Sequence, residues 1–360
     1  MIDIVFNKKE FEYDAYTLIK AFYPQEEVSI LYEGEEKTES SQKTEEAFLV
    51  VKITYNKEDT RLAILKNKET VFEETIFSAS DDERKERKNK LKQALYRGLS
   101  KETKKVLPWG DLTGIRPTKI AMGLIESGMS NVETAEFMRN TYYTSNEKTA
   151  LAITIANRER ALLADIDYKN GYSLYVGIPF CPSICLYCSF SSYPLAKWRD
   201  KVDAYLDALC KELTYIGETM KVRTLDTIYI GGGTPTTLEP EQLERLLSHI
   251  ECCFPTREVK EYTIEAGRPD SITREKLEVI RKYPVTRISV NPQTMNQATL
   301  DLIGRRHTVE DTRHAFALAR ECGFDNINMD LIVGLPGECA KDVQKTLEEV
   351  KKMEPDSLTV

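Results

Sequence analysis

The chain has 360 residues, of which 41% are hydrophobic and 30% are charged, and its formal net charge is -8 at pH 7. This composition predicts a soluble protein of about two domains and gives no electrostatic reason to expect a nucleic-acid partner. No apolar run reaches the length of a membrane span, and the first residues do not begin a signal peptide. The eight cysteines form no small disulfide framework, which indicates a reducing cytoplasm.

The first 80 residues predict a small α+β fold. Their apolar spacing favours one helix at 13–22 and strands at 2–6, 28–32, 48–55, 61–65 and 71–76. The later strands should continue an antiparallel meander. Residues 33–46, between the second and third strands, are rich in Glu, Ser, Thr and Lys, a composition typical of a solvated hairpin loop.

A charge run and a turn-rich motif follow. Residues 81–90, DDERKERKNK, open a helix whose mixed charges indicate an exposed face. Residues 108–119, PWGDLTGIRPTK, form a structured turn in which Trp109 and Arg116 either face a ligand or pack against the second domain. Three helices are then expected, at 118–126, 131–140 and 147–164.

A turn at 169–171 marks the domain boundary. We therefore expect an N-terminal α+β extension domain at residues 1–168 and a second domain at 169–360. Beyond the boundary the pattern alternates strand, loop and helix. Strands are expected at 173–177, 225–230, 261–265, 286–290, 326–332 and 356–360, and helices at stretches such as 200–219, 241–250 and 309–321.

This alternation predicts an α/β fold with a parallel sheet and helices outside it. The loops after the strands of such a fold build the active site. The chain ends within the sixth strand and before its helix, and an exposed parallel strand is an unusual end for a protein. We therefore expect a C-terminal part to be missing.

Three cysteines follow the first of these strands, where Cys181, Cys185 and Cys188 form a C-x3-C-x2-C array. Thiolates at such spacing bind either zinc or an iron–sulfur cluster. A structural zinc site needs a fourth ligand, and the three histidines of the chain lie far away in sequence. Three thiolates can instead hold three corners of a 4Fe-4S cluster and leave one iron open for chemistry. The array favours the cluster over zinc or structural thiols.

Other polar residues fall at the ends of the later strands. The motif GGGTP at 231–235 follows the second strand, Glu265 lies on the third, Gln293 follows the fourth and Asp330 lies on the fifth. These residues should converge with the cysteines. Each of the two carboxylates, in an otherwise apolar strand, should meet a cation, a hydroxyl or water, or form a salt bridge.

Two further side chains come from the motif IGRRHT. The guanidinium of Arg305 is suited to pair with a carboxylate. His307 is either a hydrogen-bond partner at the start of a helix or a catalytic acid. The remaining cysteines lack ligand spacing and need no explanation beyond burial.

Six motifs occur in a fixed order: YVGIPFCPSICLYCSF, YIGGGTPTTL, TIEAGRPD, RISVNPQTM, IGRRHT and NMDLIVGLPGE. With them, residues 172–360 resemble the oxygen-independent coproporphyrinogen III oxidases (coproporphyrinogen dehydrogenases) of the radical S-adenosylmethionine (SAM) superfamily. Residues 1–165 resemble the N-terminal extension of a clostridial and bacillar type of that enzyme. The resemblance implies a partial (β/α)6 radical SAM barrel preceded by the smaller domain.

The resemblance also implies the ligands of the cofactors. Cys181, Cys185 and Cys188 would hold a 4Fe-4S cluster. The reactive SAM would be held by Tyr175, Gly232 and Glu265, with glycine N–H groups approaching its methionine end. A second SAM would contact Tyr187, Gly233, Thr234, Gln293, Arg305 and Asp330.

The implied activity is that of an oxidoreductase of haem biosynthesis. An electron from an unidentified donor would drive cleavage of SAM, and the resulting radical would abstract hydrogen from a propionate of coproporphyrinogen III. Loss of CO2 and an electron leaves a vinyl group, and two rounds give protoporphyrinogen IX. The chain departs from the family at Gly177, often His, and at Phe190, commonly Cys in the oxidases. Phe190 is shared with relatives that bind or deliver haem, so a haem-trafficking protein on the same scaffold is the alternative.

Overall fold

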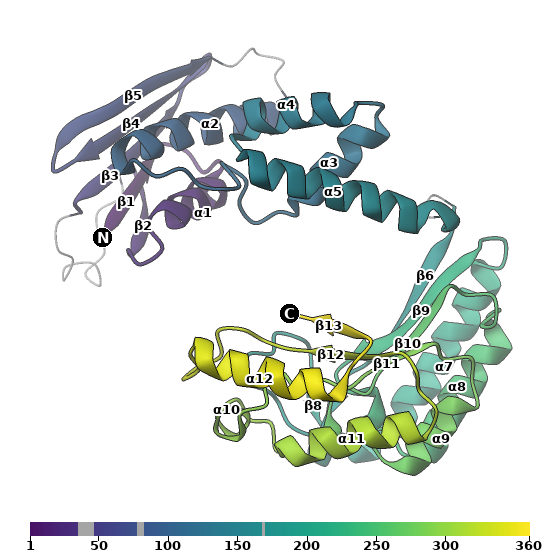
Figure 1. Ribbon diagram of the computed structural model, residues 1–360. Coiled ribbons are helices and arrows are strands. Elements are labelled where there is room, and N and C mark those ends of the chain that lie inside the picture. Colours follow the sequence, from purple (N-terminus) through teal and green to yellow (C-terminus); the bar gives the residue numbers. More distant parts are fainter. Residues whose placement is uncertain (35–46, 78–82, 168–169) are drawn as a thin grey trace. The chain divides into compact units, whose positions relative to one another are not determined.

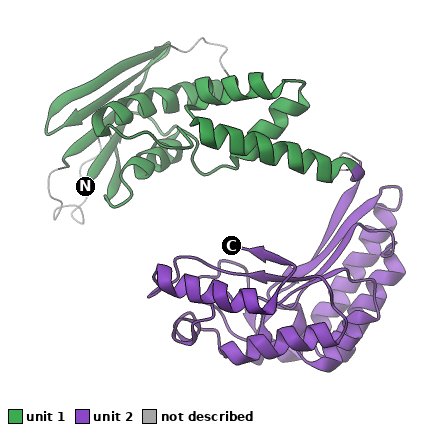
Figure 2. Cartoon of the chain, viewed as in Figure 1, with its two compact units in different colours: residues 1–164 green, residues 165–360 purple. Residues whose placement is uncertain are grey.

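The computed structural model describes residues 1–34, 47–77, 83–167 and 170–360. They form two compact units, residues 1–164 and 165–360 (Figure 2). The domain boundary expected between 168 and 169 stays a prediction, because both residues lie outside the described ranges. Within those ranges no helix combines the length and the apolar character needed to cross a membrane.

Unit 1 contains a five-stranded mixed sheet (Figure 1). Its strands are β1 (Ile2–Phe6), β2 (Val28–Tyr32), β3 (Leu49–Tyr55), β4 (Asp59–Lys66) and β5 (Glu69–Phe77), in the order β2-β1-β3-β4-β5. The antiparallel meander is confirmed for β3 to β5, but β1 runs parallel to both β2 and β3. The predicted hairpin between β2 and β3 is wrong because β1 lies between them. Residues 35–46 of its loop lie outside the described ranges.

Two helices cover one face of this sheet, α1 (Glu12–Phe22) and α2 (Arg84–Thr103). Residues 81 and 82 of the expected start of α2 are not described. Every second residue of the central strands is buried against the helices: Ile2, Ile4, Phe6, Leu49, Val51, Ile53, Leu62 and Ile64. The helices contribute apolar residues at spacings of three or four, which share one helical face. On α2 these are Leu91, Leu95 and Leu99.

Three further helices, α3 (Pro117–Glu126), α4 (Asn131–Tyr142) and α5 (Asn146–Leu162), enclose a smaller core of unit 1. Trp109 packs against this core, with the ammonium of Lys148 5.7 Å from its ring centroid. Arg116 pairs with Glu159 of α5 at 2.6 Å. Both residues of the turn motif are thus anchored within unit 1.

Unit 2 contains six parallel strands, which confirms the predicted α/β barrel class. The strands are β6 (Tyr172–Ile178), β9 (Leu225–Gly232), β10 (Glu261–Glu265), β11 (Arg287–Ser289), β12 (Ile327–Asp330) and β13 (Ser357–Thr359). They pair in the order in which they occur along the chain. Each crossover therefore passes over the same face of the sheet, because parallel crossovers share one hand.

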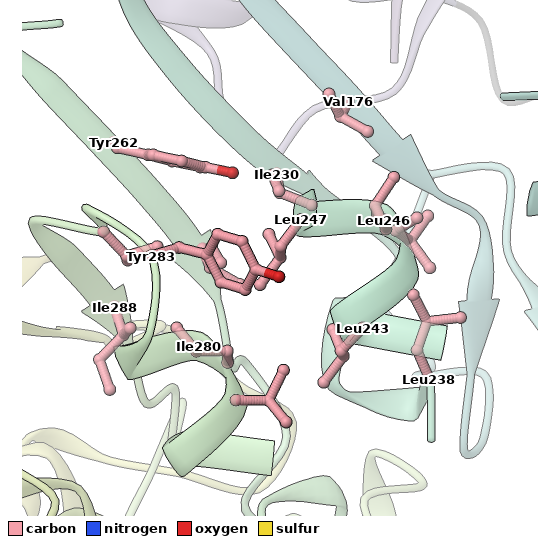
Figure 3. Close-up of a cluster of buried hydrophobic side chains, with 14 of the residues drawn as sticks. Val176, Ile230, Leu238, Leu243, Leu246, Leu247, Tyr262, Ile280, Tyr283 and Ile288 are labelled. Atoms are coloured by element: carbon pink, nitrogen blue, oxygen red, sulfur yellow. The ribbon is translucent and has the colours of Figure 1, made fainter. Parts of the chain in front are cut away.

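The crossovers place the helices of unit 2 along that face, except the helix at 297–302, whose Leu300 packs in a small separate core with Leu335 (Figure 1). They are α6 (Leu195–Trp198), α7 (Val202–Thr219), α8 (Pro240–Cys253), α9 (Arg274–Arg281), α10 (Gln297–Leu302), α11 (Val309–Glu321) and α12 (Ala340–Met353). Figure 3 shows Leu247 of α8 beside Ile230 of β9, and Leu243 of α8 facing Ile280 of α9. The strands thus turn their apolar side chains to the helices.

Successive side chains of a strand point to opposite faces, so the other face of this sheet receives the intervening residues. These include Tyr175 on β6, Tyr229 on β9, Glu265 on β10, Ser289 on β11 and Asp330 on β12. All of these are polar or aromatic. The face without helices is therefore the one equipped to bind a polar ligand.

We expect Gly110→Ala to lower the free energy of unfolding of unit 1 by about 3 kcal/mol. Gly110 has a φ of 60°, and an added Cβ would lie 1.8 Å from the carbonyl oxygen of Tyr142. Gly114→Ala is the matched control, because Gly114 has a φ of 64° and no heavy atom within 4 Å of an added Cβ. It should cost only about 1 kcal/mol.

Urea unfolding followed by Trp109 fluorescence, in a Trp198→Phe background, measures both losses. Equal losses in the two variants would contradict the steric explanation.

Candidate functional site

The predicted site residues gather in a cavity of about 150 Å³ at the carboxyl ends of the strands of unit 2. Eleven of the twelve line it: Cys181, Cys185, Cys188, Tyr187, Gly232, Gly233, Thr234, Glu265, Gln293, Arg305 and Asp330. The twelfth, Tyr175, is 61% exposed and stacks on Tyr229 at 5.8 Å between ring centroids. Sequence reasoning missed Arg268 and Asn291, which also line the cavity.

The cysteine segment is closed at its base by the short parallel strands β7 (Phe180–Cys181) and β8 (Tyr193–Pro194). Two bonds then fix it to the loop that follows α10. The hydroxyl of Ser183 donates to the carbonyl of Gly304 at 2.8 Å, and the N–H of Leu186 donates to the carbonyl of Ile303 at 2.9 Å. The cysteines are thus positioned by residues about 120 places further along the chain.

Backbone bonds also join the glycine motif to the cysteine segment. The N–H of Gly233 donates to the carbonyl of Ile178 at 2.7 Å, and the N–H of Thr234 donates to the carbonyl of Phe180 at 2.8 Å. The prediction that the N–H groups of the glycine triplet face a ligand is therefore wrong at Gly233. An added Cβ on Gly233 would lie 2.7 Å from the Phe180 oxygen and 3.0 Å from Cys181 Sγ. Glycine is required here because the two segments touch.

Arg268 is the main residue that the sequence analysis missed. Its buried guanidinium forms an ion pair with Asp270 at 2.9 Å and donates to Ser183 Oγ at 3.1 Å and to Cys185 Sγ at 3.7 Å. These contacts tie the cysteine segment to the loop that follows β10. The signal was present in TIEAGRPD, where an arginine follows the third strand at the edge of the sheet that carries the cavity.

Arg305 is buried and meets no carboxylate among the described residues, so its predicted pairing stays a prediction for a carboxylate of a ligand. Its guanidinium donates to the hydroxyl of Tyr187 at 2.9 Å and to the carbonyls of Gly267 at 2.7 Å and Asn291 at 2.6 Å. Burial raises the pKa of Tyr187 to about 12, so this partner is a neutral phenol. A buried cation with only neutral partners favours an anion in the cavity.

His307 lies beside Arg305 in sequence but does not line the cavity. It is fully enclosed, and neither ring nitrogen has a hydrogen-bond partner among the described residues. The expected role as a hydrogen-bond partner at a helix start is therefore wrong. Burial and the charge of Arg305 lower the pKa of His307 to about 4, so the imidazole is neutral at physiological pH.

The two carboxylates of the cavity have neutral partners. Glu265 accepts a hydrogen bond from the hydroxyl of Tyr229, and burial raises its pKa. Asp330 accepts one from the side-chain amide of Asn328 at 2.7 Å. Neither forms an ion pair within the described part of the chain, so the salt-bridge alternative is wrong. Each keeps free acceptor capacity for a ligand hydroxyl or ammonium.

The backbone at Gln293 is held in a left-handed conformation, with a φ of 67°. Its N–H donates to the carbonyl of Asp330, and its carbonyl accepts from the N–H of Ile332, both at 2.9 Å. Asn291 adds a third link, because its side-chain oxygen accepts from the N–H of Asp330 at 3.2 Å. Strained backbone of this kind is common at functional sites.

The cysteine array fits a cluster better than a single metal ion. Among the described residues, no three His, Cys, Asp or Glu side chains converge closely enough to hold one ion. A cubane cluster needs no such convergence, because each thiolate binds a different iron. Burial raises the pKa of Cys181, so cluster binding there must displace a proton.

A family model described as the radical SAM superfamily matches residues 175–350. The oxygen-independent coproporphyrinogen-III oxidase-like protein HemZ of Bacillus subtilis is 38% identical over 346 residues, which cover 93% of this chain and 67% of that protein. The heme chaperone HemW of the same organism is 38% identical over 189 residues, which cover 52% of this chain and 49% of that protein.

The oxygen-independent coproporphyrinogen III oxidase of Escherichia coli is 35% identical over 191 residues, which cover 52% of this chain and 41% of that protein. A solved structure of coproporphyrinogen III oxidase (HemN) from Escherichia coli matches with a TM-score of 0.48 and 31% identity, over 56% of this chain and 47% of that one. The chain thus spans two thirds of HemZ and half or less of the other relatives.

Fold, cavity and family model together define a radical SAM protein, a class that uses a 4Fe-4S cluster and SAM. Within that class, the extent of the match to HemZ sets the family. The chain belongs to the oxygen-independent coproporphyrinogen-III oxidase-like proteins.

Gly233→Ala should reduce cluster incorporation about tenfold, because its Cβ would push the cysteine segment away from β9. Gly177→Ala is the matched control, since its Cβ would meet only a Tyr175 ring carbon at 3.6 Å. Iron content and visible absorbance after anaerobic reconstitution measure the effect, and circular dichroism checks the fold. Full incorporation in Gly233→Ala would show that the close contact does not position the cysteines.

Proposed function

We propose that the protein is an oxidoreductase that converts coproporphyrinogen III to protoporphyrinogen IX by oxidative decarboxylation of two propionates to vinyls. The observation that carries the proposal is the convergence of eleven predicted site residues, from five strands and their loops, on one cavity. The match to HemZ over 93% of the chain supports it. A one-electron donor and a small-molecule porphyrinogen would be the partners.

The predicted site residues divide into three proposed sets. Cys181, Cys185 and Cys188 would hold the cluster, and Tyr175, Gly232 and Glu265 would hold the reactive SAM. A second SAM would contact Tyr187, Gly233, Thr234, Gln293, Arg305 and Asp330. At Gly233 and Thr234 the contact would have to use atoms other than the N–H groups, because these already bond the cysteine segment.

When bound, the cluster and SAM would supply an organic radical able to remove a hydrogen atom from a propionate side chain. The chain supplies binding and orientation. Arg305, a buried cation with neutral partners, would receive a carboxylate. Glu265 and Asp330 would accept from ribose hydroxyls or an ammonium. A volume of about 150 Å³ is below the usual lower limit for ligand pockets, roughly 300 Å³, so the ligands would extend beyond this cavity.

A second candidate function is haem binding and delivery on the same scaffold. Phe190 favours it, because this side chain lines the cavity and is 69% exposed. An exposed aromatic ring offers an apolar surface to a flat macrocycle. The similarity to the heme chaperone HemW points the same way.

An anaerobic turnover assay separates the two functions. The reconstituted protein is incubated with coproporphyrinogen III, a low-potential reductant and SAM, and porphyrins are separated by chromatography after oxidation. We expect the divinyl product together with SAM cleavage. Stoichiometric haem binding without any vinyl product would reject the oxidase and support the chaperone.

Cys185→Ser should abolish both the brown chromophore and SAM cleavage while leaving the fold intact, because the cluster would lose one of three protein ligands. Cys252→Ser is the matched control, since Cys252 is an exposed cysteine outside the cavity. Absorbance, iron analysis and quantification of methionine check both variants. Wild-type cleavage by Cys185→Ser would show that the ligand assignment is incorrect.

A further inference from the structure

A larger cavity lies within unit 1, away from the cysteines. Its volume is about 520 Å³, within the range of small-molecule sites. Residues 111–113, 115 and 116 of the turn motif form one wall and α2 forms another. Ile120, Leu124 and Phe137 provide an apolar surface on α3 and α4. The proposed function does not use this cavity.

The lining is rich in positive charge, although the whole chain has a net charge of -8. Three of its cations, Lys85, Lys92 and Lys119, form no ion pair with a described residue. Lys92 is the most enclosed, at 7% exposure, and its ammonium donates a hydrogen bond to Thr113 Oγ1 at 3.2 Å. Asp111 and Asp14 attract this charge but form no ion pair with it. An ammonium has three donors, and burying one without a directly paired counterion is costly. The cavity therefore favours a bound anion.

Asp111 provides a second buried charge at the same cavity. It is 2% exposed, and its Oδ1 has no hydrogen-bond partner in the described ranges. No ion pair joins it to Lys92. Burial raises the pKa of Asp111 to about 7, while burial lowers the pKa of Lys92. Charged and titratable groups surround Asp111 on four helices. They are Asp14 on α1, Lys88, Lys92 and Tyr96 on α2, Arg116 just before α3, Lys119 on α3, and Tyr142 on α4.

The remaining lining charges are already paired. Lys88 lies 3.7 Å from Asp14, and Arg116 pairs with Glu159 at 2.6 Å. Neither of these two ion pairs involves Lys92, so neither neutralises its charge. The apolar wall excludes a simple inorganic anion as the best fit, because it would leave that wall uncovered.

We propose that this cavity binds an organic anion, whose charged end is received by Lys92 and whose apolar body covers Ile120, Leu124 and Phe137. The turn motif PWGDLTGIRPTK is then a ligand-binding loop of unit 1. Gly110 sets its path, because its contact with Tyr142 admits no side chain. This cavity shares no lining residue with the cavity of the cysteines, so the proposal does not depend on the proposed oxidase activity.

The probe for the test is 8-anilinonaphthalene-1-sulfonate, which joins one sulfonate to aromatic rings and fluoresces strongly in apolar sites. It is titrated anaerobically into the cluster-loaded protein with SAM present to fill the other cavity. We expect one site per chain. Lys92→Met should weaken binding about tenfold, the equivalent of about 1.4 kcal/mol.

Matched variants separate binding from folding. Lys101→Met removes an exposed lysine from the last turn of the same helix and should bind as wild type. Lys88→Met removes a half-buried cavity lysine, so it should weaken binding even if Lys92→Met fails to fold. Circular dichroism and thermal unfolding verify the fold of each.

The pH dependence gives a second readout. Binding should be tighter at pH 6 than at pH 8, because protonation of Asp111 removes a negative charge while the sulfonate stays ionised. Asp111→Asn should bind tightly at both values. The absence of a wild-type site, or wild-type affinity in the folded lysine variants, would overturn the proposal, as would an unchanged pH dependence in Asp111→Asn.

Discussion

The close backbone contact between β9 and the cysteine segment is the constraint on which the site depends. Gly233 and Thr234 use their N–H groups to bond the carbonyls of Ile178 and Phe180, and the missing side chain of Gly233 makes room for Cys181. The glycine motif thus acts first as a structural support for the metal ligands. Any role in cofactor binding is left to its other atoms.

One face of the unit 2 sheet packs against the helices, and the opposite face carries the polar side chains of the cavity. Apolar residues such as Ile230 and Ile264 pack under the helices, while Tyr229 and Glu265, one position before or after them, face the opposite side. Strand alternation alone produces this division. The in-order pairing of the strands then brings their polar ends to one edge.

Local patterns predicted much of this molecule. The grouping of residues such as Tyr187 and Gly232 with the cysteines came from the family resemblance of the six ordered motifs. The six strands of unit 2 and the polar residues at their ends could be placed because strand period and strand-end position are local signals. The place of β1 between β2 and β3 could not, since pairing partners are set by distant segments. The partners of Arg305 were missed for the same reason: Tyr187 lies 118 positions away. Arg268 was visible in the sequence, but only the structure shows that it contacts Cys185 and so belongs to the site.

The attachment of Ser183 and Leu186 to residues 303 and 304 has a consequence for the biogenesis of the protein. Until residues 303 and 304 have been added, the cysteine segment is held only near its base, by the pairing of β7 with β8 and by the N–H groups of Gly233 and Thr234. The part that carries Cys185 then lacks its second attachment. We therefore expect the three thiols to reach their final spacing only after residue 304 has been added, so that metal loading follows folding of this part of the barrel.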